Sequence, residues 1–212
     1  MGYAHRLSDE RELALAATSD ALEQFAVMGD DLAKAQALHQ LGCLHRDIGD
    51  YQAAGAALSS ARELRIVLGD RRGELLSEIN IALLDAMAGD IDRGLESARR
   101  SLSGFESAGD QVGMGATLAI LGAVELLSGE TRAARELYGR AAARLAPWHR
   151  LMGWLRLMAA ELSYELGDPA RAARETDRAA AVFDKGRCVI AGRRLAALRG
   201  QARFAMPWCE RP

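Results

Sequence analysis

A two-residue signal, Gly-Asp, recurs along this chain at a nearly constant interval. It stands first at Gly29-Asp30 and returns every 20 residues up to Gly109-Asp110, and Gly129-Glu130 takes the next place in the series. After an interruption near Pro147 it appears again at Gly167-Asp168. Glycine accepts the left-handed conformation that ends many helices, and a following aspartate can cap the next helix with its carboxylate. Each signal therefore predicts the end of one helix and the start of another. The full set is Gly29-Asp30, Gly49-Asp50, Gly69-Asp70, Gly89-Asp90, Gly109-Asp110, Gly129-Glu130 and Gly167-Asp168-Pro169.

The segments between these signals have the pattern of amphipathic helices. After Asp90, for example, Ile91, Leu95 and Ala98 recur every three or four positions, which is the spacing of one helix face. The small share of aromatic residues and the four prolines also favour helices over strands. We therefore predict an all-α chain of about ten helices. Their expected ranges are 8–28, 31–48, 51–68, 71–88, 91–108, 111–128, 131–146, 148–166, 169–184 and 187–204.

Small residues recur at the 40-residue period of two such helices. Large side chains at these positions would keep neighbouring helices from packing at the usual distance of about 8–10 Å. The columns therefore predict antiparallel helix hairpins that stack in order. They are Gly42, Ala82, Gly122 and Ala160; Ala14, Ala54, Gly94, Ala134 and Ala172; and Ala21, Ala61, Ser101, Ala141 and Ala179.

The same period carries a resemblance to a known family. Leu38-x2-Leu41-Gly42-x2-His45 and the later Ala54-x3-Leu58-x2-Ala61 resemble the two halves of the tetratricopeptide (TPR) pattern. The period of 40 rather than 34 residues is similar to the long-helix variant in TPR domains of bacterial, including actinobacterial, regulators. The resemblance implies a right-handed superhelical α-solenoid. We expect a flexible N-terminus at 1–7, one TPR-like domain at 8–204 and a tail at 205–212. In this frame the chain starts in the middle of a repeat, so its end helices are either caps or the edges of a piece of a longer protein.

In such solenoids the first helix of each hairpin lines a concave groove, so the resemblance also implies where a partner binds. Helices 71–88 and 111–128 are apolar nearly all round, and such helices must be covered. The cover is either a bound peptide or small apolar ligand, or else superhelical curvature, another domain or a second copy of the chain. The candidate binding residues are His39, His45, Arg46, Ile79, Asn80, Leu83, Asp85, Met87, Glu125, Leu127, Trp154, Leu157, Glu161 and Tyr164.

Polar side chains occupy the column in which the family usually has tyrosine. His45, Asp85, Glu125 and Ser163 stand there, and such a row either orients a ligand or pairs with nearby arginines. An enzyme that uses His45, Asp85 and Glu125 is the alternative, although the catalytic motifs HExxH and GxSxG are absent from the sequence. We expect a protein that is not an enzyme and that uses no cofactor.

Charge and cysteine content constrain the partners further. Residues 131–212 are rich in arginine and carry a basic excess, whereas residues 1–130 are acidic. A nucleic-acid-binding solenoid is therefore a second alternative, although aromatic residues do not interleave with these arginines. Cys43, Cys188 and Cys209 form no CxxC pair, which argues against a metal site or a disulfide framework. A reducing cytoplasm fits these cysteines best, so we expect a cytoplasmic protein. No apolar run is long enough to span a bilayer, and we expect no membrane insertion.

These observations favour a binding module over a catalyst. We expect a protein segment, a peptide or a small effector to bind in the concave, largely apolar groove, and a homodimer is a further candidate. The module would serve as the sensory or docking domain of a larger transcriptional or signalling regulator.

Overall fold

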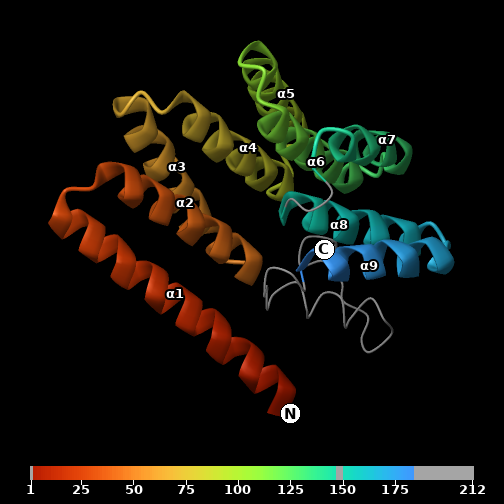
Figure 1. Cartoon of the computed structure of the whole chain (residues 1–212), viewed down its shortest axis with the longest axis horizontal. Helices are drawn as coiled ribbons and strands as arrows, with labels where there is room; N and C mark the ends of the chain where they lie inside the picture. Colours follow the sequence, from red (N-terminus) through yellow and green to blue (C-terminus); the bar gives the residue numbers. More distant parts are fainter. Residues whose placement is uncertain (1, 147–149, 184–212) are drawn as a thin grey trace. The chain divides into compact units, whose positions relative to one another are not determined.

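The computed structural model of the chain describes residues 2–146 and 150–183, and these residues form nine α-helices and no strand (Figure 1). The prediction of an all-α chain is therefore confirmed. The predicted tenth helix, 187–204, and the tail at 205–212 lie outside the described residues. The helices are α1 (Gly2–Met28), α2 (Asp31–Ile48), α3 (Tyr51–Val67), α4 (Arg71–Met87), α5 (Ile91–Ser107), α6 (Gln111–Leu127), α7 (Thr131–Ala142), α8 (Arg150–Glu165) and α9 (Pro169–Phe183).

Most of these boundaries fall within two residues of the predicted ones. The exceptions are α1, which already begins at Gly2, and α7, which ends at Ala142.

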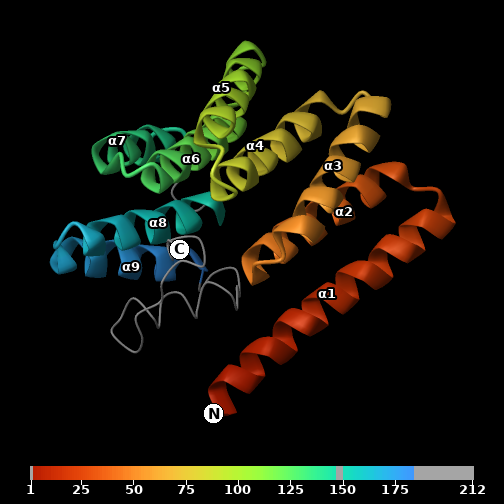
Figure 2. The same ribbon diagram turned by 180° about the vertical axis from the view of Figure 1, so that it is seen from behind.

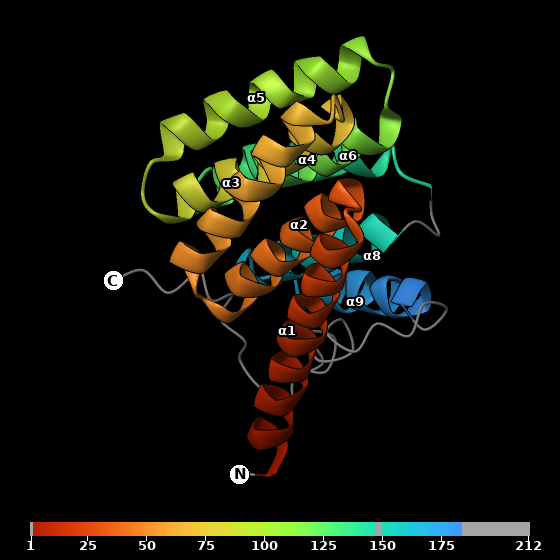
Figure 3. The same cartoon turned by 90° about the vertical axis from the view of Figure 1, so that its left-hand side faces the viewer.

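The chain divides within α5 into two compact units, residues 1–97 (unit 1) and residues 98–212 (unit 2). In unit 1, α1 packs on α2, α2 on α3 and α3 on α4 (Figures 2 and 3). In unit 2, α6 packs on α7, α7 on α8 and α8 on α9. First helices of successive hairpins also touch, α2 with α4 and α6 with α8.

The Gly-Asp signals are the junctions between these helices, as predicted. All seven glycines have positive φ angles, between +66° and +99°. At Asp50 the backbone N–H donates to the carbonyl of His45 at 2.9 Å and thereby closes the end of α2. The carboxylate of the same residue accepts from the N–H of Ala53 at 3.1 Å and thereby caps α3. The same side-chain cap is present at Asp30, Asp70, Asp90, Asp110 and Asp168.

Glu130 makes only half of this junction. Its N–H donates to the carbonyl of Glu125 at 2.8 Å, but its side chain makes no cap hydrogen bond to α7. Glutamate carries one more methylene than aspartate, and it is not among the residues preferred at the N-cap. The capping role assigned to Asp therefore does not extend to Glu at this position.

The columns of small residues mark close helix contacts, which confirms the packing predicted from them. A Cβ atom added to Gly42 of α2 would lie 2.6 Å from Cγ of Leu58 in α3. A Cβ atom on Gly94 of α5 would lie 2.6 Å from the carbonyl oxygen of Ala82 in α4. Alanines of the same columns are fully buried, namely Ala54, Ala61, Ala82, Ala134, Ala141, Ala160 and Ala179.

Candidate binding site in unit 1

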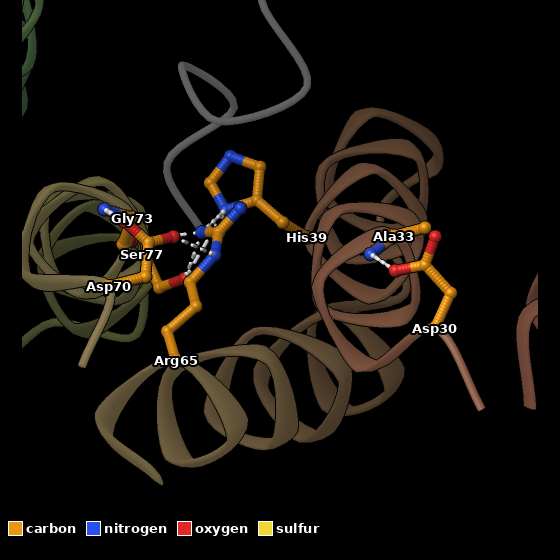
Figure 4. A network of polar contacts seen from close by, with 7 residues as sticks. All are labelled: Asp30, Ala33, His39, Arg65, Asp70, Gly73 and Ser77. Atoms are coloured by element: carbon orange, nitrogen blue, oxygen red, sulfur yellow. Dashed lines mark hydrogen bonds and ion pairs between the residues drawn. The ribbon is translucent and has the colours of Figure 1, made fainter. Parts of the chain in front are cut away.

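A buried arginine on α3 connects α3 to the first helices on either side of it. The Arg65 side chain is 6% exposed, and its guanidinium lies between α2 and α4 (Figure 4). Its Nη1 donates to the carbonyl of Gly73 at 2.9 Å and to the hydroxyl of Ser77 at 2.8 Å. Its Nε lies 3.7 Å from a carboxylate oxygen of Asp70. We call His39, Arg65, Asp70, Gly73 and Ser77 the Arg65 cluster.

His39 completes this cluster from α2. Its Nδ1 lies 3.3 Å from Ser77 Oγ and 3.3 Å from Arg65 Nη1. Burial, together with the positive charges of Arg65 and Arg46, lowers the pKa of His39 to about 4, so the ring is neutral at pH 7. A hydrogen on Nδ1 would face the N–H groups of the cationic Arg65 Nη1 3.3 Å away, so we assign the accepting role to Nδ1 and the proton to Nε2. Nε2 points away from Arg65 (Figure 4), so His39 presents an N–H donor on that side.

A second polar group links α2 to α4. Arg46 donates from Nη1 to the side-chain oxygen of Asn80 at 2.7 Å, and from Nε and Nη2 to one carboxylate oxygen of Asp47 at 3.1 and 2.9 Å. Burial raises the pKa of the Cys43 thiol, which stays protonated and lies 3.8 Å from the same Asn80 oxygen. We call Cys43, Arg46, Asp47 and Asn80 the Arg46 cluster.

Three of the residues expected to bind a partner therefore lie in these two clusters: His39, Arg46 and Asn80. The apolar candidates of α4 are placed differently. Ile79 is 2% exposed and Leu83 is 5% exposed, and Met87 packs against the buried cluster around Leu58 and Leu84. Ile79 and Leu83 are thus part of the core, and Met87 is partly buried against it.

The polar row is divided into separate pairs. His45 Nδ1 lies 3.6 Å from Asp50, Asp85 lies 3.2 Å from Arg93, and Glu125 lies 3.8 Å from Arg99. Burial raises the pKa of Asp85, and Arg93 partly opposes that rise. For Asp85 and Glu125 the arginine-pairing alternative is therefore the one observed. Ser163 donates to the carbonyl of Ala159 in its own helix at 2.7 Å.

The remaining candidates belong to unit 2. Leu157 is fully buried and Glu161 is 8% exposed, whereas Tyr164 is 55% exposed. Trp154 and Leu127 are half-buried. Among the residues that the structure describes, no group of three or more His, Cys, Asp or Glu side chains is placed to hold a metal ion.

The sequence interpretation missed Arg65 and Ser77, although the repeat contains a signal for both. Forty residues after Arg65 stands Phe105, which is 1% exposed, and 40 residues after His39 stands Ile79. Ser77 has Thr117 as its counterpart, and Thr117 is fully buried. Arg65 is thus a charged residue in a column of large apolar residues. A charged residue at a position that is apolar in the next repeat is the signal in the sequence for the Arg65 cluster.

Comparisons with known proteins support the fold of the chain but do not assign it to a family. No family model and no curated protein matches the chain. Solved structures do match, among them three at 13–17% sequence identity that include a TPR domain. Together with the 40-residue hairpins and their Gly-Asp junctions, these matches show that the chain has a TPR-like α-solenoid fold.

Three solved structures illustrate this similarity. The Rap conjugation gene regulator of plasmid pLS20, in complex with the Phr* peptide, matches 94% of this chain with a TM-score of 0.74 and 13% identity. The chain covers 57% of that regulator's length. BtubC (BKLC) from P. vanneervenii matches with a TM-score of 0.59, 17% identity and coverage of 94% of this chain and 87% of BtubC. The TPR2AB domain of yeast Sti1, in complex with pHSP90, matches with a TM-score of 0.50, 14% identity and coverage of 95% and 83%.

Within residues 2–146 and 150–183, no helix combines the length and the apolar character that a membrane span needs.

Proposed function

We propose that unit 1 binds an extended peptide segment of a protein partner along α2 and α4. The observation that carries this proposal is the pair of hydrogen-bond donors on α2, His39 and Arg46. His39 presents its Nε2–H on the side away from Arg65 (Figure 4). Arg46 uses one N–H of Nη1 for Asn80 and one N–H of Nη2 for Asp47, and each of these nitrogens carries a second N–H. Carbonyl and carboxylate oxygens of a peptide are the matching acceptors.

The spacing of the two donors suits an extended chain. His39 and Arg46 are seven residues apart, so they lie on nearly the same face of α2, about 10 Å apart along its axis. An extended peptide rises about 3.3 Å per residue, so this distance corresponds to about three residues. A peptide that follows α2 would place carbonyl oxygens at both donors.

Both donors are held in position before a ligand arrives. Arg46 is fixed by Asp47 and Asn80, and its side chain is 15% exposed. His39 is fixed by Ser77 and Arg65. Side chains that are already ordered lose less conformational entropy when a ligand binds, which favours affinity.

The similar structures lend support to this proposal. The Rap regulator and the Sti1 TPR2AB domain are each described in complex with a peptide or protein segment. The similarity to the Rap regulator favours a unit that docks or senses the peptide as part of a larger regulator. A small effector with two acceptor groups about 10 Å apart is the alternative ligand.

A peptide selection tests the proposal. We would enrich binders from a displayed random-peptide library on the full chain and measure their affinities by fluorescence anisotropy. Arg46→Ala is expected to weaken binding at least tenfold, and Arg46→Lys to weaken it less, because lysine keeps the charge but not the forked donor geometry. Arg71→Ala is the matched control, since this exposed arginine pairs with Glu74 on its own helix. Affinities should then change by less than twofold.

Two results would contradict the proposal. One is that no peptide is enriched above an unrelated helical control protein. The other is that the enriched peptides bind Arg46→Ala as tightly as the wild type while circular dichroism shows both proteins folded.

A further inference from the structure

Unit 2 contains a small groove with an apolar floor. Its walls come from α7 and α9 and its floor from α8, and its volume is about 150 Å³. Met152, Leu155 and Leu162 line the floor and are themselves at most 3% exposed. Gly139 lines the α7 wall, and a Cβ atom added there would meet no other atom within 4 Å. We call this the α7–α9 groove.

The rim of the groove carries an excess of positive charge. Arg135, Arg156 and Arg171 line it, together with one carboxylate, Glu175. Both oxygens of Glu175 are already engaged, one by Arg156 Nη1 and the other by Arg178 Nη1, each at 2.8 Å. Arg135 and Arg171 are exposed. Neither side chain has a hydrogen bond or ion pair with another residue of the part of the chain that the structure describes.

The volume of the groove limits what can fill it. Sites for drug-sized ligands usually measure about 300–1,000 Å³, so a cavity of about 150 Å³ is too small for most such compounds. The volume of the groove is about that of one large amino-acid side chain. The apolar floor selects an apolar side chain, and the two available guanidinium groups select acidic groups beside it.

We propose that the α7–α9 groove anchors one aliphatic side chain of a protein partner whose neighbouring residues are acidic. The aliphatic group lies over Met152 and Leu155, and the flanking carboxylates pair with Arg135 and Arg171. This site lies wholly in unit 2 and is independent of the donors on α2, so a partner segment can use either site without the other.

A short peptide provides a direct probe. We would titrate the full chain, at low ionic strength, into fluorescein-labelled Gly-Glu-Glu-Leu-Glu-Glu-Gly and follow anisotropy. Two companion probes replace the leucine with glycine or the glutamates with lysines. The leucine probe is expected to bind at least tenfold more tightly than the glycine probe, and the lysine probe is expected not to bind. Higher salt should weaken the binding, because the ion pairs at an exposed rim are screened.

Two substitutions at Gly139 separate occupation of the groove from helix stability. Gly139→Phe places a ring in the groove and is expected to weaken binding of the leucine probe at least tenfold. Gly139→Ala adds only a Cβ in open space, favours the helix and should leave the affinity within twofold. The double variant Arg135→Glu/Arg171→Glu is expected to abolish binding, with the helical circular dichroism retained. Arg46→Ala should not change it, which keeps this test distinct from that of unit 1.

Several outcomes would overturn the inference. Absence of binding by the leucine probe at millimolar protein concentration is one, and unchanged binding by Gly139→Phe is another. If the glycine probe or a single-stranded oligonucleotide binds with the same dependence on Arg135 and Arg171, the surface is a general anion-binding surface. The apolar anchor is then rejected.

Discussion

Arg65 lies over Gly73 in the same way that Phe105 lies over Gly113 one repeat later. A Cβ atom on Gly73 would lie 2.6 Å from Nε of Arg65, and a Cβ atom on Gly113 would overlap the ring of Phe105. Both glycines leave room for a large side chain from the preceding helix. The same place in the repeat thus holds a guanidinium in unit 1 and an aromatic ring in unit 2. A buried charge costs several kcal/mol of desolvation, which its hydrogen bonds must offset.

Replacement of the residues around Arg65 by those found 40 positions later tests whether the two places in the repeat are equivalent. Arg65→Phe alone should destabilise the chain by about 2–4 kcal/mol, because Ser77, His39 and the Gly73 carbonyl lose their donor. The triple variant His39→Ile/Arg65→Phe/Ser77→Thr installs the residues found 40 positions later and should recover at least half of that loss. Urea unfolding followed by far-ultraviolet circular dichroism measures both. A triple variant no more stable than Arg65→Phe would show that the two places are not equivalent.

His39 should make stability depend on pH in a defined window. Its pKa is about 4 in the folded chain and about 6.5 when unfolded. Between these values the unfolded state binds the additional proton, so stability is fully present above pH 6.5 and is lost as the pH falls toward 4. The loss is at most about 3 kcal/mol.

The variant His39→Gln isolates this contribution, because glutamine can accept from Arg65 but cannot be protonated. The difference in unfolding free energy between wild type and variant, measured from pH 7 to pH 4, should shrink or reverse by up to about 3 kcal/mol. Carboxylates titrate in both proteins and largely cancel. A pH-independent difference would mean that His39 is not held neutral.

Two glycines of unit 1 should respond in opposite directions to alanine. Gly94→Ala places its Cβ 2.6 Å from the backbone oxygen of Ala82, which cannot move without separating α4 and α5, so we expect a loss of about 1–3 kcal/mol. Gly55→Ala, in α3, meets no atom within 4 Å and should gain about 0.5–1 kcal/mol. Thermal unfolding of the two variants in parallel gives the comparison. Equal effects would contradict close packing at Gly94.

The sequence predicted the scaffold because its signals are local. Gly49 and Asp50 determine a helix end and a helix start through hydrogen bonds within about five residues, and Gly94 marks a contact through its size alone. Of the residues in the two polar clusters, the sequence interpretation named His39, Arg46 and Asn80. They lie on first helices, which the TPR resemblance places on the groove, and their part in binding stays a prediction.

The other site residues depend on information that a single helix does not contain. The apolar pattern of α4 is the same whether Ile79 and Leu83 face a ligand or the core, and only the packed chain shows that they are buried. Arg65 lies on a second helix, outside the expected groove. Its place becomes informative only when it is aligned with Phe105 in the next hairpin. The α7–α9 groove involves three helices at once, so no single segment indicates it.

The Gly-Asp junctions also have a consequence for how such a chain can change in length. At six of the seven, an aspartate closes the end of one helix with its N–H and caps the next helix with its carboxylate, through hydrogen bonds within five residues. Removal of residues 51–90 would therefore leave Asp50 directly before Ile91, with an intact cap-forming residue at the new joint. Whole hairpins can be gained or lost as cassettes, whereas an insertion of one or two residues inside a helix would rotate its buried face out of register.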